Sequence, residues 1–236
     1  MTAPAEPTTL PVPDEFTQVH EAALAGFVRP ASWFEGATRR AIVEESRSAR
    51  DCAFCAERAA ALSLAAVRGA HTTVTDLPSG LVEMVHRLTT DSGRLTRAWF
   101  DEVLASGVTR EQYVEASGLI GSSTIADTFA TAIDGAPREL AAPEDGMPSG
   151  ERNEQLADVG AYVGVMDYEH PHPRFEGASA PNICRALAMV PSAMDEFWEL
   201  FGPHYRPMSA QAEHEFGRSQ IELVASRTSA LNECFY

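Results

Sequence analysis

"SRSARDCAFCAERAAALSLAAVRG" (residues 46–69) contains two cysteines, Cys52 and Cys55, at the start of an alanine-rich helical run. The chain ends in a related stretch, "TSALNECFY" (residues 228–236), in which an acidic residue, a cysteine and an aromatic residue again follow a helical pattern. When Cys52 is aligned with Cys234, the position that would match Cys55 lies beyond Tyr236. The two stretches therefore predict one complete dithiol motif and one partial second copy.

The regions around this motif show helical periodicity. Apolar residues recur at three- and four-residue spacing, which is typical of helices with one buried face. Thr109 and Gln112 have the spacing of a capping box. The glycines and serines in the middle of the same run predict either a close approach between helices or a kink. Helices are expected at 14–27, 38–48, 55–68, from 79 onward, and at 108–133, 182–201 and 217–236. Because alternating β-branched runs are missing, the predicted fold class is all-α.

Composition divides the chain into four parts. Residues 1–13 carry four prolines and are expected to form an N-terminal arm. Residues 14–134 form the predicted helical unit with the cysteine pair, and the polar, proline-rich residues 135–180 form a linker and an extended loop. Residues 181–236 are the partial second repeat.

Net charge and hydropathy restrict the partners. The chain has 236 residues and a formal net charge of −16, so we expect neither nucleic acid nor a membrane surface as a partner. A secretory signal and an apolar run of about 18 residues are both missing, which favours a cytoplasmic protein. Four cysteines are too few for a disulfide framework, and in a reducing compartment a close pair indicates metal binding or redox chemistry.

A cysteine at a helix N-terminus is stabilised as the thiolate by free backbone N–H groups and the helix dipole. The second cysteine, one turn later, can then resolve a sulfenic acid or a mixed disulfide on the first. Zinc would need two more ligands, and Cys184 and Cys234 are isolated in the sequence, so no metal and no other cofactor is predicted. The alternative is that both cysteines are buried, unreactive residues with a structural role only.

Three stretches resemble the alkylhydroperoxidase D and carboxymuconolactone decarboxylase superfamily. They are the helix–Cys-x-x-Cys–helix region of residues 38–68, residues 85–137, and the partial motif of residues 182–236. The resemblance implies an all-α alkylhydroperoxidase D-like fold, assembly as homo-oligomers, and peroxide reduction by the cysteine pair. It also implies that Cys55 is the attacking cysteine, with Cys52 resolving, and that a thiol protein is the reductant.

The chain departs from the family's proton relay. The family has a glutamate about twelve residues before the first cysteine and a histidine four after the second, whereas this chain has Arg40 and Ala59. In the partial copy, Glu222 lies twelve residues before Cys234, but the second cysteine and the histidine are missing. Peroxidase chemistry through the usual relay is therefore not expected.

Other residues can replace the relay. Glu44 and Glu45 precede the cysteines on the same expected helix, while His71 and His86 follow them. A histidine with a pKa near neutrality can carry the proton that a thiol loses, although a lone histidine or a helical glutamate more often has a structural role. The predicted catalytic residues are Cys55, Cys52, His71, His86 and Glu45.

Two other functions fit the same residues. One is a cofactor-free decarboxylase or isomerase acting on a lactone-like substrate through His71, His86 or Glu45, without the thiols. The other is a non-catalytic oligomerising scaffold whose relay has decayed. The loop "DYEHPHPRFEG" holds Asp167, Glu169, His170 and His172 and could bind a metal, but its prolines favour a plain linker; "AEHEFG" around His214 is a weaker candidate.

Self-association is expected from apolar residues near the C-terminus. Large exposed apolar patches are uncommon on monomers, and a partial repeat leaves such residues in need of cover. The residues concerned are Phe197, Trp198, Leu200 and Phe201.

Overall fold

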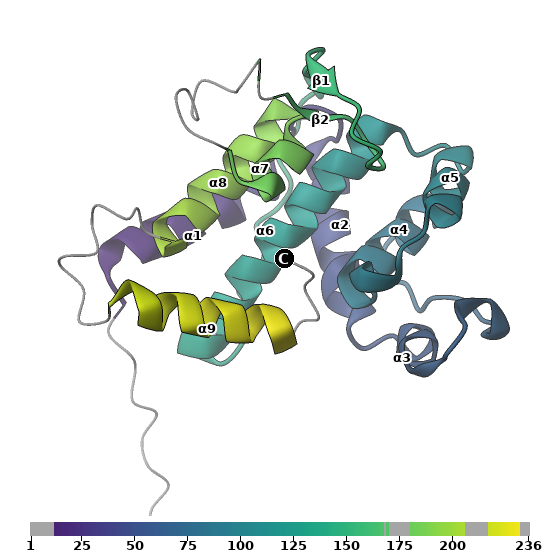
Figure 1. Cartoon of the computed structure of the whole chain (residues 1–236), viewed down its shortest axis with the longest axis horizontal. Helices are drawn as coiled ribbons and strands as arrows, with labels where there is room; N and C mark the ends of the chain where they lie inside the picture. Colours follow the sequence, from purple (N-terminus) through teal and green to yellow (C-terminus); the bar gives the residue numbers. More distant parts are fainter. Residues whose placement is uncertain (1–11, 168, 170–179, 206–216, 232–236) are drawn as a thin grey trace, which may run out of the picture.

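The computed structural model describes residues 12–167, 169, 180–205 and 217–231, and these residues are predominantly helical (Figure 1). The expected N-terminal arm lies almost wholly outside them. The helices are α1 (Asp14–Gly26), α2 (Gly36–Ala49), α3 (Ala53–Ala60), α4 (Ser79–Thr90), α5 (Arg97–Ala105), α6 (Arg110–Asp134), α7 (Asn182–Leu187), α8 (Pro191–Tyr205) and α9 (Arg218–Leu231). Two 3-10 turns, η1 (Leu64–Ala66) and η2 (Ser92–Arg94), and a short antiparallel pair, β1 (Leu156–Ala157) and β2 (Val165–Met166), complete the described elements.

Helix α6 forms the centre of the molecule. It runs between α2 and α4 on one side and α1 and α8 on the other (Figure 1). The capping box predicted from Thr109 and Gln112 is confirmed, with both of its hydrogen bonds present. The helix ends at Gly135, whose φ of +83° is the left-handed conformation that glycine adopts most easily. Fully buried side chains around α6 include Ile42, Met84, Phe100 and Met194.

The close helix approach expected from the glycines of α6 is confirmed at Gly118. A Cβ added to Gly118 would lie 3.2 Å from the Cβ of Ala193 in α8. A side chain here would push α6 and α8 apart, because helix backbones come this close only over small residues. Gly121 has more room, since its added Cβ would meet the ring of Phe197 at 3.6 Å.

The apolar residues that prompted the expectation of self-association are mostly covered within the chain. Phe197 and Leu200 are 4% and 1% exposed, respectively, in the core formed by α6 and α8. Trp198 and Phe201 are partly buried against the same core. These four side chains therefore do not require a second copy of the chain to cover them.

The helix expected over residues 55–68 ends at Ala60, eight residues early. Arg94 explains this difference, because its guanidinium donates hydrogen bonds to the carbonyls of Arg58 and Ala61 at 2.9 and 2.8 Å. Those carbonyls are thereby satisfied without a further helical turn. Beyond Ala60 the chain is free to fold back towards α4, and this return brings His71 to the cysteines.

The segment after α6 packs along the loop that follows α1. Glu144 donates its backbone N–H to the carbonyl of Val28, and Gly150 donates to that of Ser32, both at 2.8 Å. Among the described helices, none is long and apolar enough to cross a bilayer.

Candidate functional site

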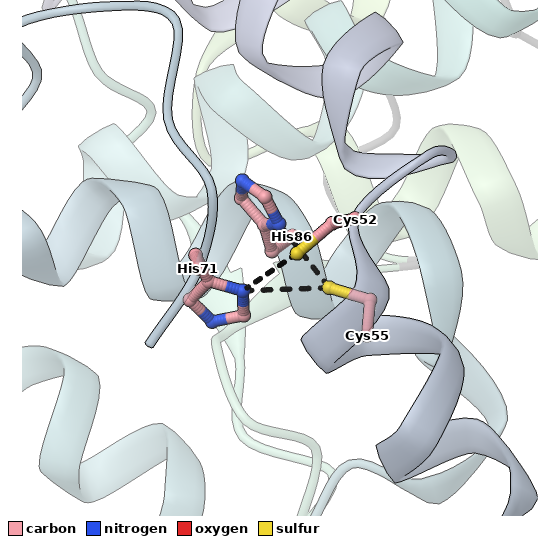
Figure 2. Close-up of side chains that lie close together, drawn as sticks. All are labelled: Cys52, Cys55, His71 and His86. Atoms are coloured by element: carbon pink, nitrogen blue, oxygen red, sulfur yellow. Dashed lines mark hydrogen bonds between the residues drawn. The ribbon is translucent and has the colours of Figure 1, made fainter. Parts of the chain in front are cut away.

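Cys52 and Cys55 lie at the N-terminus of α3, as predicted. Cys52 is the N-cap residue and the helix begins at Ala53, so Cys55 lies in its first turn. Both are free thiols and are 2% and 3% exposed. Their sulfur atoms lie within 4.8 Å of each other, and the two side chains point towards each other (Figure 2).

His71 approaches the sulfurs from the loop between η1 and α4. Its Nδ1 lies 3.4 Å from the Cys55 sulfur and 3.8 Å from the Cys52 sulfur. Its Nε2 is 2.8 Å from a carboxylate oxygen of Glu83 on α4. Arg58 and the indole N–H of Trp99 donate to the same carboxylate, at 3.0 and 3.2 Å, and hold it in place.

His86 reaches the sulfurs from the other side, from α4. Its Nδ1 lies 3.2 Å from the Cys55 sulfur, and its Nε2 is 2.8 Å from Glu45 on α2. The side chains of His86 and Glu45 are both fully buried. The second oxygen of Glu45 accepts hydrogen bonds from the Thr75 hydroxyl at 2.6 Å and the Val74 backbone N–H at 3.3 Å.

The two histidines are therefore arranged alike. An ionised carboxylate only accepts hydrogen bonds, so Nε2 of each ring carries a proton and donates it to Glu83 or Glu45. In a neutral ring this leaves the Nδ1 lone pair directed at the sulfurs. Figure 2 shows both rings turning Nδ1 towards the cysteine pair.

The environment distinguishes the two thiols. Burial alone would raise the pKa of Cys52, but hydrogen bonds from the backbone N–H groups of Cys55 and Thr72 and from His71 lower that pKa to about 6. Burial raises the pKa of Cys55 to about 11, and the neighbouring Cys52 contributes in the same direction. At neutral pH, Cys52 is thus the thiolate and Cys55 the thiol.

The acidic residues stay ionised although they are partly or wholly buried. Burial raises the pKa of Glu83, but hydrogen bonds from His71 and Arg58 outweigh it and lower the pKa to about 2. The pKa of His71 is lowered by burial and raised by Glu83 and the Cys52 sulfur, with a net increase. In Glu45, hydrogen bonds from Thr75 and His86 likewise outweigh burial and lower the pKa.

All five predicted site residues meet in one place. His71 and His86 also come close to both cysteines, since their nearest ring nitrogens lie within 4.8 Å of the sulfurs. Glu44, the other glutamate considered, points away and pairs with Arg40 at 2.8 Å.

Sequence reasoning missed Glu83 and Arg58. Glu83 lies three residues before His86, on the same turn of α4, and this spacing is the one signal that could have indicated it. Of the loop considered for metal binding, Asp167 and Glu169 are described, and the backbone N–H of Glu169 donates to Asp167. His170, His172, His214 and Cys234 lie outside the described residues.

A cleft of about 850 Å³ lies at the C-terminal end of α4. Thr90 lines this cleft and donates to the carbonyl of His86 at 2.8 Å. The lining is mixed in polarity and includes Asp91 and Arg94 as well as the apolar Ile120 and Phe197. Thr90 therefore connects the cleft to the backbone of His86, while the two cysteines do not line it.

Comparison with models of known protein families, with curated proteins and with solved structures finds no match.

Proposed function

We propose that the protein is a thiol-dependent peroxidase of the alkylhydroperoxidase D-like type, in which Cys52 and Cys55 reduce a small hydroperoxide. The observation that carries this proposal is the pairing of each thiol with an imidazole whose other nitrogen is held by a carboxylate. Such a series can deliver and remove protons at sulfur. It replaces the relay that Arg40 and Ala59 cannot supply.

In the first step, the Cys52 thiolate attacks the terminal oxygen of the hydroperoxide. A sulfur–oxygen bond forms as the oxygen–oxygen bond breaks, so that sulfur is oxidised by two electrons and the peroxide is reduced. The leaving alkoxide takes a proton from the His71 imidazolium and departs as the alcohol. Cys52 is then a sulfenic acid.

In the second step, His86 accepts the proton of the Cys55 thiol. The Cys55 thiolate attacks the Cys52 sulfur, forming the disulfide and breaking the sulfur–oxygen bond. The hydroxide that leaves takes the proton from His86 and becomes water. A cytoplasmic thiol protein would return the disulfide to the dithiol by exchange.

This order of attack differs from the one implied by the family resemblance, in which Cys55 attacks first. The reason for the difference is the position of Cys52 at the helix N-cap, where backbone N–H groups and His71 stabilise its thiolate. The cleft at the end of α4 has a lining of polar and apolar residues, which suits an organic hydroperoxide.

The test is oxidation of the reduced, metal-free protein with one equivalent of hydroperoxide, followed by peptide mass spectrometry. We expect an intramolecular Cys52–Cys55 disulfide in the wild type. C55S should instead stop at a sulfenic acid on Cys52, which a dimedone probe captures, and C52S should consume little peroxide. C234S, at a cysteine outside the described residues, should behave like the wild type.

Two results would contradict the proposal, and a third would reverse its order of attack. If C234S is the damaging substitution, the first motif is not the reactive one. If peroxide leaves both thiols intact while His71, His86 or Glu45 variants lose activity on a lactone-like substrate, the acid–base alternative holds instead. If C52S forms a sulfenic acid on Cys55 at the wild-type rate, Cys55 attacks the peroxide first, as the family resemblance implies.

A further inference from the structure

Four potential ligand atoms converge at the start of α3. The two sulfurs and the Nδ1 atoms of His71 and His86 all lie within 4.8 Å of one another. The sulfur–nitrogen separations are 3.2, 3.4 and 3.8 Å. With a zinc–sulfur bond of about 2.3 Å and a zinc–nitrogen bond of about 2.0 Å, a tetrahedral site places sulfur and nitrogen roughly 3.5 Å apart. Three of the four sulfur–nitrogen separations are therefore close to those of a tetrahedral Cys₂His₂ centre, and the remaining pairs lie within 4.8 Å.

The surroundings of the histidines also match a metal centre. A histidine that binds a metal through one nitrogen usually donates its other N–H to a carboxylate, which fixes the ring and strengthens the ligand. His71 donates to Glu83 and His86 donates to Glu45, each at 2.8 Å. The carboxylates are themselves held, Glu83 by Arg58 and Glu45 by Thr75. Both rings are thus oriented with Nδ1 towards a common point.

The packing around α3 gives a third, independent argument. Cys52, Cys55 and Phe54 form a small buried cluster separate from the main core, and among the described residues Val67 is the partly buried apolar side chain packed against it. Leu62, in the loop after α3, is fully exposed. Because this cluster is small, it buries little apolar surface between α4 and the segment formed by α3 and its following loop. Small structural units of this kind commonly depend on a metal or a disulfide for their stability.

From these observations we propose that the reduced protein binds one zinc-class divalent ion through Cys52, Cys55, His71 and His86. Two thiolates and two imidazoles favour Zn²⁺ over the harder Mg²⁺ and Ca²⁺, which take oxygen ligands. With four protein ligands the centre is closed, as in structural zinc sites. The ion joins α3, the loop after it and α4. The inference concerns the reduced thiols and does not rest on peroxide chemistry.

The experiment uses the full chain, stripped with a chelator under a non-thiol reductant and then titrated with Zn²⁺ against a chromogenic competitor. We expect one ion per chain, with a Kd below about 100 nM at neutral pH. Co²⁺ in its place should give the visible absorption of a tetrahedral complex and a sulfur-to-cobalt charge-transfer band. X-ray absorption of the zinc form should show two sulfur and two nitrogen ligands, a result that needs no variant to fold.

Variants assign the ligands. We expect zinc binding to be at least 100-fold weaker in each of the ligand variants C52S, C55S, H71A and H86A. It should be roughly 10- to 100-fold weaker in E45Q and E83Q, because these two glutamates accept the hydrogen bonds that orient the histidines. C234S serves as the thiol control and the double variant H170A/H172A as the histidine control, and both should bind like the wild type. Circular dichroism of each stripped variant checks that it folds.

Four outcomes would overturn the inference. Three of them are a zinc shell made of oxygen ligands, a Kd above about 10 μM, and a wild-type Kd in a C52S/C55S double variant. Loss of binding in H170A/H172A alone would place the ion elsewhere and overturn it as well. Because the peroxide assay is run on stripped protein and the titration without peroxide, either proposal can fail while the other stands.

Discussion

At the scale of single residues, the cysteine pair is asymmetric because its two members meet different parts of the same helix end. Cys52 is the N-cap residue, and the nearby backbone N–H groups of Cys55 and Thr72 lower its pKa. Cys55 lies inside the first turn and faces two imidazole nitrogens. The lower pKa of Cys52 and the higher pKa of Cys55 follow from this difference. A thiolate and a thiol side by side are what stepwise disulfide formation requires.

This asymmetry predicts the pH dependence of alkylation in the reduced, metal-free protein. Iodoacetamide should modify Cys52 with a midpoint near pH 6, because its pKa is lowered to about 6, while Cys55 should react only at strongly alkaline pH. In H71A the Cys52 midpoint should rise by about one pH unit, or ~1.4 kcal/mol, as a hydrogen bond to the thiolate is lost. Peptide mass spectrometry after timed labelling measures both sites.

The control for this experiment is H204Q, a histidine substitution that leaves the contacts of His71 with the sulfurs intact. Its Cys52 midpoint should match the wild type. An unchanged midpoint in H71A would mean that the backbone N–H groups alone stabilise the thiolate.

The sequence was sufficient to indicate the residues of this cluster, but not how they meet. A Cys-x-x-Cys before a helical run indicates a thiol pair at a helix N-terminus, because three residues make about one turn. The meeting of His71 with the sulfurs depends on where α3 ends, and Arg94, more than thirty residues away, determines that point. Glu83 could not be assigned for the same reason, since its partners Arg58 and Trp99 come from other elements.

At the scale of elements, α6 positions the site by packing closely on α8 while α2 and α4 cover its other side. The capping box of α6 and the close helix approach at its glycines could be predicted from sequence, because both depend on residues that are near one another in the chain. The early end of α3 was not, because alanine-rich sequence favours continued helix and a tertiary contact overrides that preference.

A matched pair of substitutions tests the packing of α6. G121A should raise the free energy of unfolding by about 0.5–1 kcal/mol, because alanine has the higher helix propensity and its Cβ meets Phe197 at an ordinary contact distance. G118A should gain less or be destabilising, since its Cβ lies 3.2 Å from that of Ala193. Urea denaturation of the two variants gives the comparison. Equal stabilisation by both would show that α6 and α8 are not in tight contact at Gly118.

At the scale of the whole molecule, an aromatic cluster joins α1 to α6 and α8; its His20 is buried, and Phe16, Phe129 and His204 are partly buried. His20 of α1 stacks on Phe129 of α6 at 4.0 Å between ring centroids. The Nε2 atoms of His20 and His204 lie 2.8 Å apart, and Phe16 stacks on His204 from the other side. Because His20 is only 2% exposed, adding a proton to it places a charge in an apolar contact between three helices.

This cluster predicts that acid weakens the attachment of α1. Burial, followed by the charges of His204 and Arg138, lowers the pKa of His20 from 6.5 to about 4. Between these two pH values the unfolded chain binds the proton and the folded chain does not, so stability falls as the pH drops from about 6.5 to about 4. H20F keeps the stacking on Phe129 and removes the titrating group. The decrease in its free energy of unfolding between these two pH values should therefore be roughly 2 kcal/mol smaller than in the wild type.

Urea denaturation at several pH values between 4 and 7 measures the effect, with the wild type, H20F and F16L compared. F16L alters the same cluster without removing a titrating group, so it should lower stability by a similar amount at each pH and keep the wild-type slope. Groups outside the cluster, Glu83 among them, also titrate in acid and contribute equally to all three proteins. His204, whose pKa is also lowered by burial, contacts both His20 and Phe16. The difference in slope between H20F and F16L therefore reports on the His20–His204 pair, and parallel slopes in the two variants would show that its protonation does not destabilise the fold.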